Sequence, residues 1–275
     1  MKGQEPNGKR VLITGGTSGL GFSLAKYYLN NGYEVTVTGR KPVSMPEYNG
    51  KFEFVAADFS DLKQTSDAIK QLCEIHRFDI VINNAGILSP PGLQLTNDRI
   101  EYTFQVNFLT QLLVNEITIR RTEPGHRILF AAVTSMVYEI AGKDPEFPGK
   151  GYNYNPLKAY SNSKRCLAMM GTYLLSRFSD KNIRFIAIDP GIFSSHIYRM
   201  QRRWFRIMYN VGTFFMRKPS GVAERFGRLT RRNDLRNGAI YRLFRRKVRH
   251  APESTVNAGK FWDQCYEVIE PFLKD

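Results

Sequence analysis

The sequence has few cysteines and no long apolar run. Its three cysteines, Cys73, Cys166 and Cys265, are far apart in a chain of 275 residues and show neither a disulfide framework nor metal-ligand spacing. We therefore expect free thiols in a reducing compartment and a cytoplasmic protein. No stretch reaches the roughly 18 apolar residues of a membrane span, and residues 1–8 lack the apolar core of a signal peptide. The four histidines form no cluster that would predict a metal site.

Acidic residues are scarce in one segment of the chain. Residues 199–250 hold 16 lysines and arginines but only two acids, Glu224 and Asp234, and so carry almost all of the formal net charge of +15. Such a basic field attracts anions, such as lipid headgroups, phosphorylated ligands or an acidic partner. Nucleic-acid binding is not favoured, because no recognition module accompanies these residues. The alternative is a solvated surface that arginine keeps soluble.

Apolar residues are abundant enough for a packed core. They make up 42% of the chain, which excludes intrinsic disorder as the main state. Short apolar runs predict strands at residues 11–13, 34–38, 52–57, 80–82, 128–133 and 183–188. Helical patterns lie between them at 22–29, 62–75, 98–120 and 156–179. This alternation predicts one α/β domain, a doubly wound parallel sheet of the Rossmann type with helices on both faces.

A glycine-rich loop joins the first expected strand to the first helix. Glycine is needed where a backbone turns tightly and approaches a pyrophosphate, whose charge then lies at the helix N-terminus. The strand, loop and helix context therefore predicts a dinucleotide site. The loop residues assigned to the cofactor are Gly15, Thr17, Ser18, Gly19, Leu20 and Gly21.

The end of the second strand carries two cations and no acid. An acid at this position binds the ribose 2′-hydroxyl of NAD, whereas an arginine accommodates the 2′-phosphate of NADP. Arg40 and Lys41 follow Gly39 here. The sequence therefore predicts NADP(H) as the cofactor. The alternative is that both residues are ordinary surface cations.

A tyrosine and a lysine lie four residues apart on an expected helix. Tyr160 and Lys164 share one helix face at this spacing. An ammonium beside a phenol lowers the pKa of the phenol from about 10, so Tyr160 can act as a general acid or base nearer neutral pH. Open α/β sheets bind ligands at the carboxyl ends of their strands. Three companion groups occupy such ends: Asn83-Asn84-Ala85-Gly86, Ser135 and Asp189-Pro190-Gly191.

This ordered set resembles the short-chain dehydrogenase/reductase family over residues 9–197. The resemblance rests on Thr14-Gly15-x-x-x-Gly19-x-Gly21, Asn83-Asn84-Ala85-Gly86, Asn107, Ser135, Tyr160-x-x-x-Lys164 and Pro190-Gly191. It implies that Tyr160 is the general acid/base, that Lys164 lowers its pKa and holds the nicotinamide ribose, and that Ser135 orients the substrate oxygen. It also implies that Asn107 holds a proton-relaying water. The further cofactor contacts that it implies are Asp58, Phe59, Asn84, Ala85, Gly86, Tyr160, Lys164, Pro190, Gly191, Ile192 and Ser195.

Two features depart from the smallest members of that family. Ser135 and Tyr160 are 25 residues apart, because residues 142–155 are added between them. A similar insertion occurs in the retinol-dehydrogenase-like and protochlorophyllide-reductase-like branch, which the chain most resembles. The residues before Ser135 also differ from that branch, so a slip in register would make Thr134 the active hydroxyl instead.

The C-terminal third combines apolar and basic residues. Apolar side chains recur every three or four residues from Trp204 to Phe215, and arginines recur on a neighbouring face. Such a helix either lies in a membrane interface or packs as a lid over the core and substrate. Both interpretations predict an apolar entrance to the substrate site and therefore a hydrophobic substrate. The alternative is a substrate with an anionic headgroup that binds the arginines. A final amphipathic helix is expected at 258–273.

We therefore expect an NADP(H)-dependent carbonyl reductase or alcohol dehydrogenase that uses no metal. Residues 1–8 form a tail, 9–197 the dinucleotide-binding and catalytic core, and 198–275 a lid and basic extension of the same domain. The expected partners are a small hydrophobic carbonyl or alcohol, a second copy in a homo-oligomer and, through residues 199–250, an anionic membrane surface. A non-catalytic NADP-binding scaffold is the alternative, although the intact catalytic set argues against it.

Overall fold

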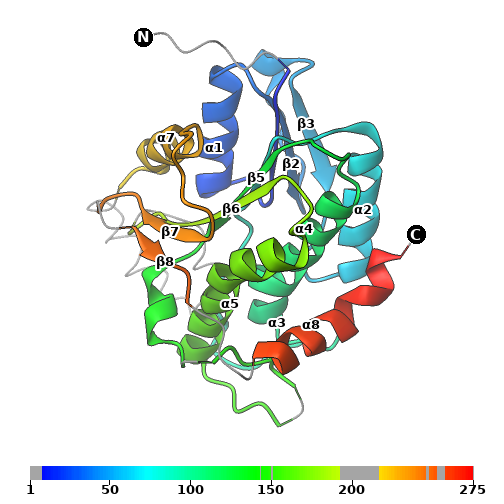
Figure 1. Ribbon diagram of the computed structural model, residues 1–275, viewed down its shortest axis with the longest axis vertical. Coiled ribbons are helices and arrows are strands. Elements are labelled where there is room, and N and C mark those ends of the chain that lie inside the picture. Colours follow the sequence, from blue (N-terminus) through cyan, green and yellow to red (C-terminus); the bar gives the residue numbers. More distant parts are fainter. Residues whose placement is uncertain are drawn as a thin grey trace.

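A mostly parallel sheet forms the centre of the molecule (Figure 1). The computed structural model describes residues 8–142, 144–149, 151–192, 217–245, 248–252 and 258–274. The eight strands have the order β3-β2-β1-β4-β5-β6-β7-β8, and only the pair β7 and β8 is antiparallel. They are β1 (Arg10–Ile13), β2 (Glu34–Gly39), β3 (Phe52–Ala56), β4 (Ile80–Asn83), β5 (Ile128–Val133), β6 (Ile183–Asp189), β7 (Ala239–Arg242) and β8 (Arg249–His250). The predicted doubly wound α/β fold is confirmed.

Helices cover both faces of this sheet (Figure 1). On one face, α1 (Gly19–Asn30) packs against α7 (Pro219–Thr230), and their apolar side chains join those of the sheet in one buried cluster. The opposite face carries α2 (Leu62–Ile75), α4 (Thr110–Arg120) and α5 (Pro156–Arg177), and α8 (Ala258–Leu273) lies over α2 and α4. With helices on both sides, the strands are buried on both faces, which is why their sequences read as continuous apolar runs.

The helix expected at 98–120 has an irregular beginning. A single turn, α3 (Tyr102–Phe104), leads through a π-helical stretch, Gln105–Leu109, into α4. The side chain of Glu101 accepts hydrogen bonds from the backbone N–H groups of Thr103 and Phe104 and so caps this start. π-Helical turns within α-helices often mark functional positions, and Asn107 lies in the middle of this one.

The expected amphipathic helix at the end of the chain is present, and it packs on the core. Phe261 and Trp262 of α8 are buried, and the Trp262 ring stacks on Tyr173 with centroids 4.0 Å apart. The fully buried carboxylate of Glu116 pairs with Arg120 and Arg177 and accepts a hydrogen bond from the Tyr266 hydroxyl. These contacts tie α8 to α4 and α5. Burial of the Tyr266 side chain raises its pKa, and the neighbouring Glu116 carboxylate raises it further.

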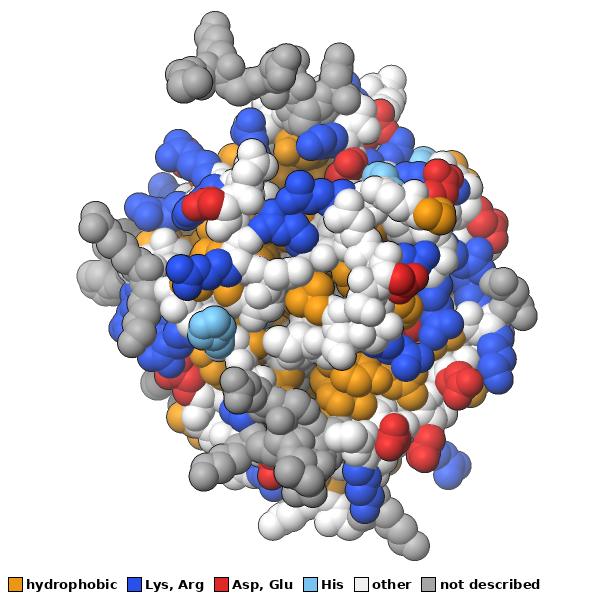
Figure 2. Space-filling model, viewed as in Figure 1, with side chains coloured by type: hydrophobic (Ala, Val, Ile, Leu, Met, Phe, Trp, Pro, Cys, Tyr) orange, Lys and Arg blue, Asp and Glu red, His pale blue; other side chains and the backbone are white. Residues whose placement is uncertain are grey.

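Residues 217–252 add α7, β7 and β8 to the same sheet. The sequence did not predict β7, because it has only four residues and ends in a charged one, Arg242. Lysine and arginine side chains gather over this side of the molecule (Figure 2). The expected amphipathic segment from Trp204 to Phe215 lies outside the described residues. Within the described ranges, we find no helix with the length and apolar character that a membrane span requires.

Candidate active site

The predicted site residues follow strand ends at one edge of the sheet. The glycine loop follows β1, Arg40 follows β2, Asn84 follows β4, Ser135 follows β5 and Pro190 follows β6. The strand order reverses between β1 and β4, and a crevice at such a reversal is where open α/β sheets bind ligands. The topology thus brings segments far apart in the sequence to a common edge.

Close backbone packing requires glycine in the loop after β1. Gly15 has φ +63°, and a Cβ there would lie 2.9 Å from the Cα of Ala85. A Cβ on Gly21 would lie 2.4 Å from the carbonyl oxygen of Gly15 and 2.5 Å from Nδ2 of Asn84. The N-terminus of α1 at Gly19 is left free of side-chain caps, since Ser18 is exposed and makes no capping hydrogen bond. Such an N-terminus favours an anion.

A threonine that sequence reasoning left without a role connects two of the loops. The Thr14 hydroxyl accepts hydrogen bonds from the backbone N–H groups of Asn84 and Ala85, at 2.9 and 3.0 Å. In return, Nδ2 of Asn84 donates to the carbonyl oxygens of Thr14 and Gly15. The Gln111 side chain donates to the Ala85 carbonyl. The amide of Asn84 therefore holds the glycine loop in place. The only hint in the sequence was that Thr14 precedes Gly15.

The end of β2 contacts the glycine loop. A Cβ on Gly39 would lie 2.6 Å from Cγ2 of Thr17, so Thr17 lies directly beside the residue that precedes Arg40. Arg40 and Lys41 are both exposed, and within the described residues neither forms an ion pair. Two unpaired cations next to a glycine loop leave room for an additional phosphate.

The loop after β3 carries the other expected adenine-side residues. Oδ1 of Asp58 accepts hydrogen bonds from the backbone N–H and the hydroxyl of Ser60, at 3.0 and 2.8 Å. Phe59 is buried, and its carbonyl accepts from the Thr110 hydroxyl at 2.8 Å. Leu20 of the glycine loop is also buried. Phe59 and Leu20 therefore belong to the packed core, in the clusters on opposite faces of the sheet.

The Tyr160 and Lys164 side chains share a buried face of α5. Asn155 caps this helix by accepting from the backbone N–H of Lys158 at 3.0 Å, and Pro156 occupies the first helical position. Tyr160 is 9% exposed and Lys164 is 3% exposed. The Lys164 ammonium lies 5.9 Å from the centre of the Tyr160 ring and donates to the Val133 carbonyl at 2.9 Å. Burial lowers the pKa of Lys164 to about 8.

Asn107 lies behind this pair and is fully buried. Its Nδ2 donates to the Ile87 carbonyl and to the Ser163 hydroxyl, both at 3.0 Å, and its Oδ1 accepts from the Ile87 N–H at 2.7 Å. A Cβ on Gly86 would lie 3.2 Å from Oδ1 of Asn107 and 3.5 Å from Nζ of Lys164. The structure thus brings together Gly86, Asn107 and Lys164. Ser163, which sequence reasoning missed, connects Asn107 to α5.

The two candidate hydroxyls after β5 differ in their surroundings. Thr134 is buried, and its hydroxyl donates to the Lys164 carbonyl at 3.1 Å. Ser135 is half-buried and does not cap the short helix that follows it, Met136–Ile140. The Thr134 hydroxyl is therefore engaged with the backbone of α5, while Ser135 is the more accessible of the two.

The turn after β6 completes the edge. Gly191 has φ +71°, and its N–H donates to Oδ1 of Asp189 at 2.9 Å. Pro190 before it is buried, and Ile192 after it is 66% exposed. Ser195 lies outside the described residues.

The inserted residues 142–155 pack against the start of α5. The Asn162 side chain donates to the Glu146 carbonyl at 2.7 Å and accepts from the Glu146 N–H at 3.0 Å. The Tyr154 hydroxyl donates to the Pro90 carbonyl at 2.5 Å. The insertion therefore bridges α5 and the loop after β4, next to Tyr160. Asn162 had no assigned role in the sequence, although it lies two residues after Tyr160.

Large apolar side chains are exposed around this edge. They come from the loop after β4, the turn after Ser135, the first turn of α5 and the residue after Gly191. These six are Leu93, Leu95, Met136, Ile140, Leu157 and Ile192. Elsewhere among the described residues, only Ile75 and Val248 are comparably exposed. We call the six residues the apolar rim.

The residues at this edge fit a dinucleotide and give no indication of a metal. The glycines leave space that a Cβ would fill, next to a helix N-terminus and two unpaired cations. Across the ranges that the structure describes, no three His, Cys, Asp or Glu side chains form a group that could hold a metal ion.

Comparison with known proteins agrees with this geometry. The family model for short chain dehydrogenase matches residues 9–145. The chain belongs to the short-chain dehydrogenase family. This short-chain dehydrogenase is 26% identical over 215 residues to oxidoreductase calI of Penicillium decumbens, covering 70% of the chain and 62% of that protein. It is equally similar to polyprenol dehydrogenase of Homo sapiens, again at 26% over 215 residues, covering 70% of the chain and 64% of that protein.

The chain therefore spans less than two thirds of the length of these two relatives. Among solved structures, a short chain dehydrogenase from Leptospira borgpetersenii with bound NAD+ matches with a TM-score of 0.67 at 22% identity. That match covers 87% of this chain and 92% of the other. At this identity the likeness shows that the two proteins share a fold.

Proposed function

We propose that this short-chain dehydrogenase is an NADP(H)-dependent oxidoreductase that interconverts a carbonyl and an alcohol. The observation that carries the proposal is the buried Lys164 ammonium beside Tyr160, with Gly86 next to both Lys164 and Asn107, and with Ser135 accessible after β5. A scaffold that only bound a nucleotide would not need a buried lysine, because burial disfavours the charged form of its side chain.

Each of these residues has a part in the proposed reaction. A bound nicotinamide supplies or accepts the hydride. Tyr160 gives a proton to the substrate oxygen in reduction and removes it in oxidation. The Lys164 ammonium favours the phenolate of Tyr160 by its charge, and Ser135 donates a hydrogen bond that orients the same oxygen. Asn107 is held by the Ile87 backbone and the Ser163 hydroxyl, and it is the residue to which we assign the relaying water.

The preference for NADP over NAD rests on Arg40 and Lys41. Both are exposed and unpaired within the described residues, next to Thr17 at the end of β2. Guanidinium and ammonium groups here would contact a 2′-phosphate. Around the base and pyrophosphate we assign Asp58, Phe59 and the glycine loop. On the nicotinamide side we assign the turn from Pro190 to Ile192, with Ser195.

The substrate that we propose is hydrophobic. The apolar rim includes residues next to Ser135 and Gly191 in the sequence, and one at the start of α5, which carries Tyr160. Exposed apolar side chains that form a patch commonly mark a binding surface. One relative is named for a polyprenol, which agrees with an apolar alcohol. The insertion at 142–155, which borders the rim, supports the proposed likeness to the retinol-dehydrogenase-like branch.

The surroundings of the protein are also a proposal. Three free, buried cysteines support a reducing compartment such as the cytoplasm. The basic residues of 199–250 support contact with an anionic membrane surface, which would deliver an apolar substrate to the rim. A homo-oligomer stays a prediction, which sedimentation velocity tests.

The proposal is tested with Tyr160→Phe. We measure NADPH and NADH binding to both proteins and turnover of a panel of lipophilic aldehydes and ketones. We expect NADPH to bind more tightly than NADH in both proteins, and Tyr160→Phe to lower turnover by about 10²-fold or more. Cofactor binding without turnover in either protein would favour the non-catalytic scaffold. Equal turnover by both would exclude Tyr160 as the acid/base.

A further inference from the structure

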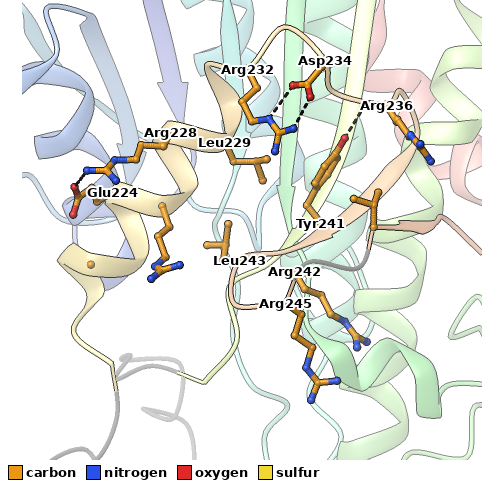
Figure 3. A pocket seen from close by; sticks show the side chains of 13 residues that line it. Glu224, Arg228, Leu229, Arg232, Asp234, Arg236, Tyr241, Arg242, Leu243 and Arg245 are labelled. Carbon is orange, nitrogen blue, oxygen red and sulfur yellow. Dashed lines mark hydrogen bonds and ion pairs between the residues drawn. The ribbon is translucent and has the colours of Figure 1, made fainter. Parts of the chain in front are cut away.

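A groove between α7 and β7 concentrates arginine side chains (Figure 3). It has a volume of about 980 Å³ and is bounded by α7, the turn before β7, and β7 with the residues after it. Six arginines line it: Arg225, Arg228, Arg232, Arg236, Arg242 and Arg245. Only two acids line it, Glu224 and Asp234, so the wall is strongly positive. None of the residues assigned to the cofactor or to catalysis belongs to this wall.

Half of these arginines already have acidic partners. Arg228 pairs with Glu224, and Arg232 binds both carboxylate oxygens of Asp234 (Figure 3). The Arg242 side chain is 7% exposed and pairs with Glu139, with Asp189 at 3.6 Å. The two acids of the wall are therefore neutralised by neighbours on their own elements.

The other three arginines form no salt bridge within the described residues, although the charge of Arg245 acts on Asp189. Arg225, Arg236 and Arg245 are exposed on α7, on the turn before β7 and just after β7. The Arg225 guanidinium lies over the Phe244 ring, 4.8 Å from its centre, and so has an aromatic neighbour but no carboxylate. The groove thus holds three unpaired positive charges that approach it from different elements.

These features indicate the class of ligand. Like charges on one concave wall repel each other, and an anion in the groove would relieve that repulsion. Guanidinium groups donate in a planar fork that matches phosphate oxygens better than a lysine ammonium does. Leu229, Leu243 and the ring of Tyr241 add an apolar part to the wall, which suits an esterified phosphate. We propose that this groove binds a ligand that carries a phosphate group with two or more negative charges.

The groove lies next to the catalytic loops without being part of them. Arg242 reaches Glu139, four residues after Ser135, and Asp189, two residues before Gly191. The Arg242 side chain therefore lines the groove and also contacts residues near Ser135 and Gly191. A phosphate-bearing ligand would sit beside the edge at which we propose that the substrate enters, but it would bind whether or not the protein is an oxidoreductase.

The test uses the full chain and pyrophosphate as the probe, by titration calorimetry with NADPH present at saturation. We expect Arg225→Gln/Arg236→Gln/Arg245→Gln to bind pyrophosphate at least about tenfold more weakly than the unchanged protein. The matched control, Lys9→Gln/Lys51→Gln/Lys260→Gln, removes three exposed charges elsewhere and should bind as before. A third variant with the same arginines changed to lysine keeps the charge but loses the forked donors, and should also weaken binding.

Equal affinity of the unchanged protein and the Arg→Gln variant would overturn the proposal. An equal loss of pyrophosphate affinity in the Lys→Gln control would also overturn it, because binding would then depend on the overall charge of the protein. If NADPH does not bind, the proposed function fails, yet the comparison of the variants still reports on the groove, because the glycine loop is the same in all of them.

A second arm separates the two sources of such a phosphate. Vesicles of phosphatidylcholine with phosphatidic acid are sedimented with each protein, with and without pyrophosphate. The ligand is a lipid headgroup if the unchanged protein co-sediments with the vesicles, the Arg→Gln variant does not, and pyrophosphate inhibits the co-sedimentation. Pyrophosphate binding without co-sedimentation identifies a soluble phosphate ester. If the protein binds neither pyrophosphate nor the vesicles, the proposal is wrong.

Discussion

Burial at single residues determines the chemistry that they can perform. Lys164 is 3% exposed and donates to the Val133 carbonyl, and burial lowers its pKa to about 8. Near neutral pH it keeps its charge, but it does so at a cost in stability, because the folded protein binds this proton less tightly than the unfolded chain does. An apolar side chain at this position would avoid this loss of stability, so a purely structural role does not explain the lysine.

This cost predicts how stability changes with pH. The pKa of Lys164 is about 8 in the folded protein and about 10.4 in an unfolded chain. The free energy of unfolding should therefore rise between those pH values, by up to about 1.4 kcal/mol per pH unit, because the unfolded chain holds the proton longer. Lys164→Met lacks this group. Urea unfolding at pH 7 to 10 should show the unchanged protein gaining stability relative to Lys164→Met as pH rises through 8.

An exposed lysine provides the control for that measurement. Lys9→Met removes a lysine at the surface, so the difference in unfolding free energy between it and the unchanged protein should not vary over the same pH range. If the difference in unfolding free energy between Lys164→Met and the unchanged protein is also constant with pH, folding does not lower the pKa of Lys164.

Some site residues could be predicted from the sequence and others could not, and the reason is physical. Gly15, Tyr160 and Lys164 have roles that local spacing expresses, at a strand end or on one helix face. Thr14 and Ser163 act through partners 70 and 56 residues away. Only the folded topology brings those partners together, so no local pattern could indicate them.

At the scale of whole elements, the strands and helices of the core were predictable because each is a short apolar run or a periodic pattern. β7 escaped prediction because its burial depends on partners elsewhere: Arg242 at its end is buried only because Glu139 and Asp189 compensate its charge. α8 was predicted because its apolar face repeats with helical spacing. Its attachment through Glu116 could not be foreseen from that pattern.

The glycine loop and α1 form one packed unit, which predicts the effect of a single methyl group. Gly21→Ala places a Cβ 2.4 Å from the Gly15 carbonyl oxygen, and backbone atoms cannot move aside without distorting the loop. We expect a loss of about 1–3 kcal/mol in unfolding free energy and weaker NADPH binding, measured by urea unfolding and by titration.

The matched control for that substitution is Gly221→Ala. It also lies in a helix, α7, but a Cβ there meets nothing within 4 Å. Because alanine favours a helix over glycine by up to about 1 kcal/mol, this variant should be as stable as the unchanged protein or more so. Equal behaviour of the two variants would show that the close approach at Gly21 does not constrain the loop.

At the scale of the molecule, the net charge is large and positive. The formal net charge is +15, and basic side chains gather over α7, β7 and β8 (Figure 2). Many surface cations elsewhere are paired, as in Lys63–Asp67 and Arg10–Glu34, but Arg40 and Lys41 form no ion pair within the described residues. Excess charge of one sign disfavours the compact state by self-repulsion.

Self-repulsion predicts that added salt stabilises the fold. At pH 7, raising sodium chloride from about 10 to 200 mM shortens the screening length from about 30 Å to less than 10 Å, so the unfolding temperature should rise. At pH 9.8, the isoelectric point of the sequence, the net charge vanishes and the same salt change should raise it less. A fall at pH 7 would mean that screening weakens favourable ion pairs more than it relieves repulsion. An equal rise at both pH values would mean that the net charge does not determine the effect of salt, since the arginines keep their charge at pH 9.8.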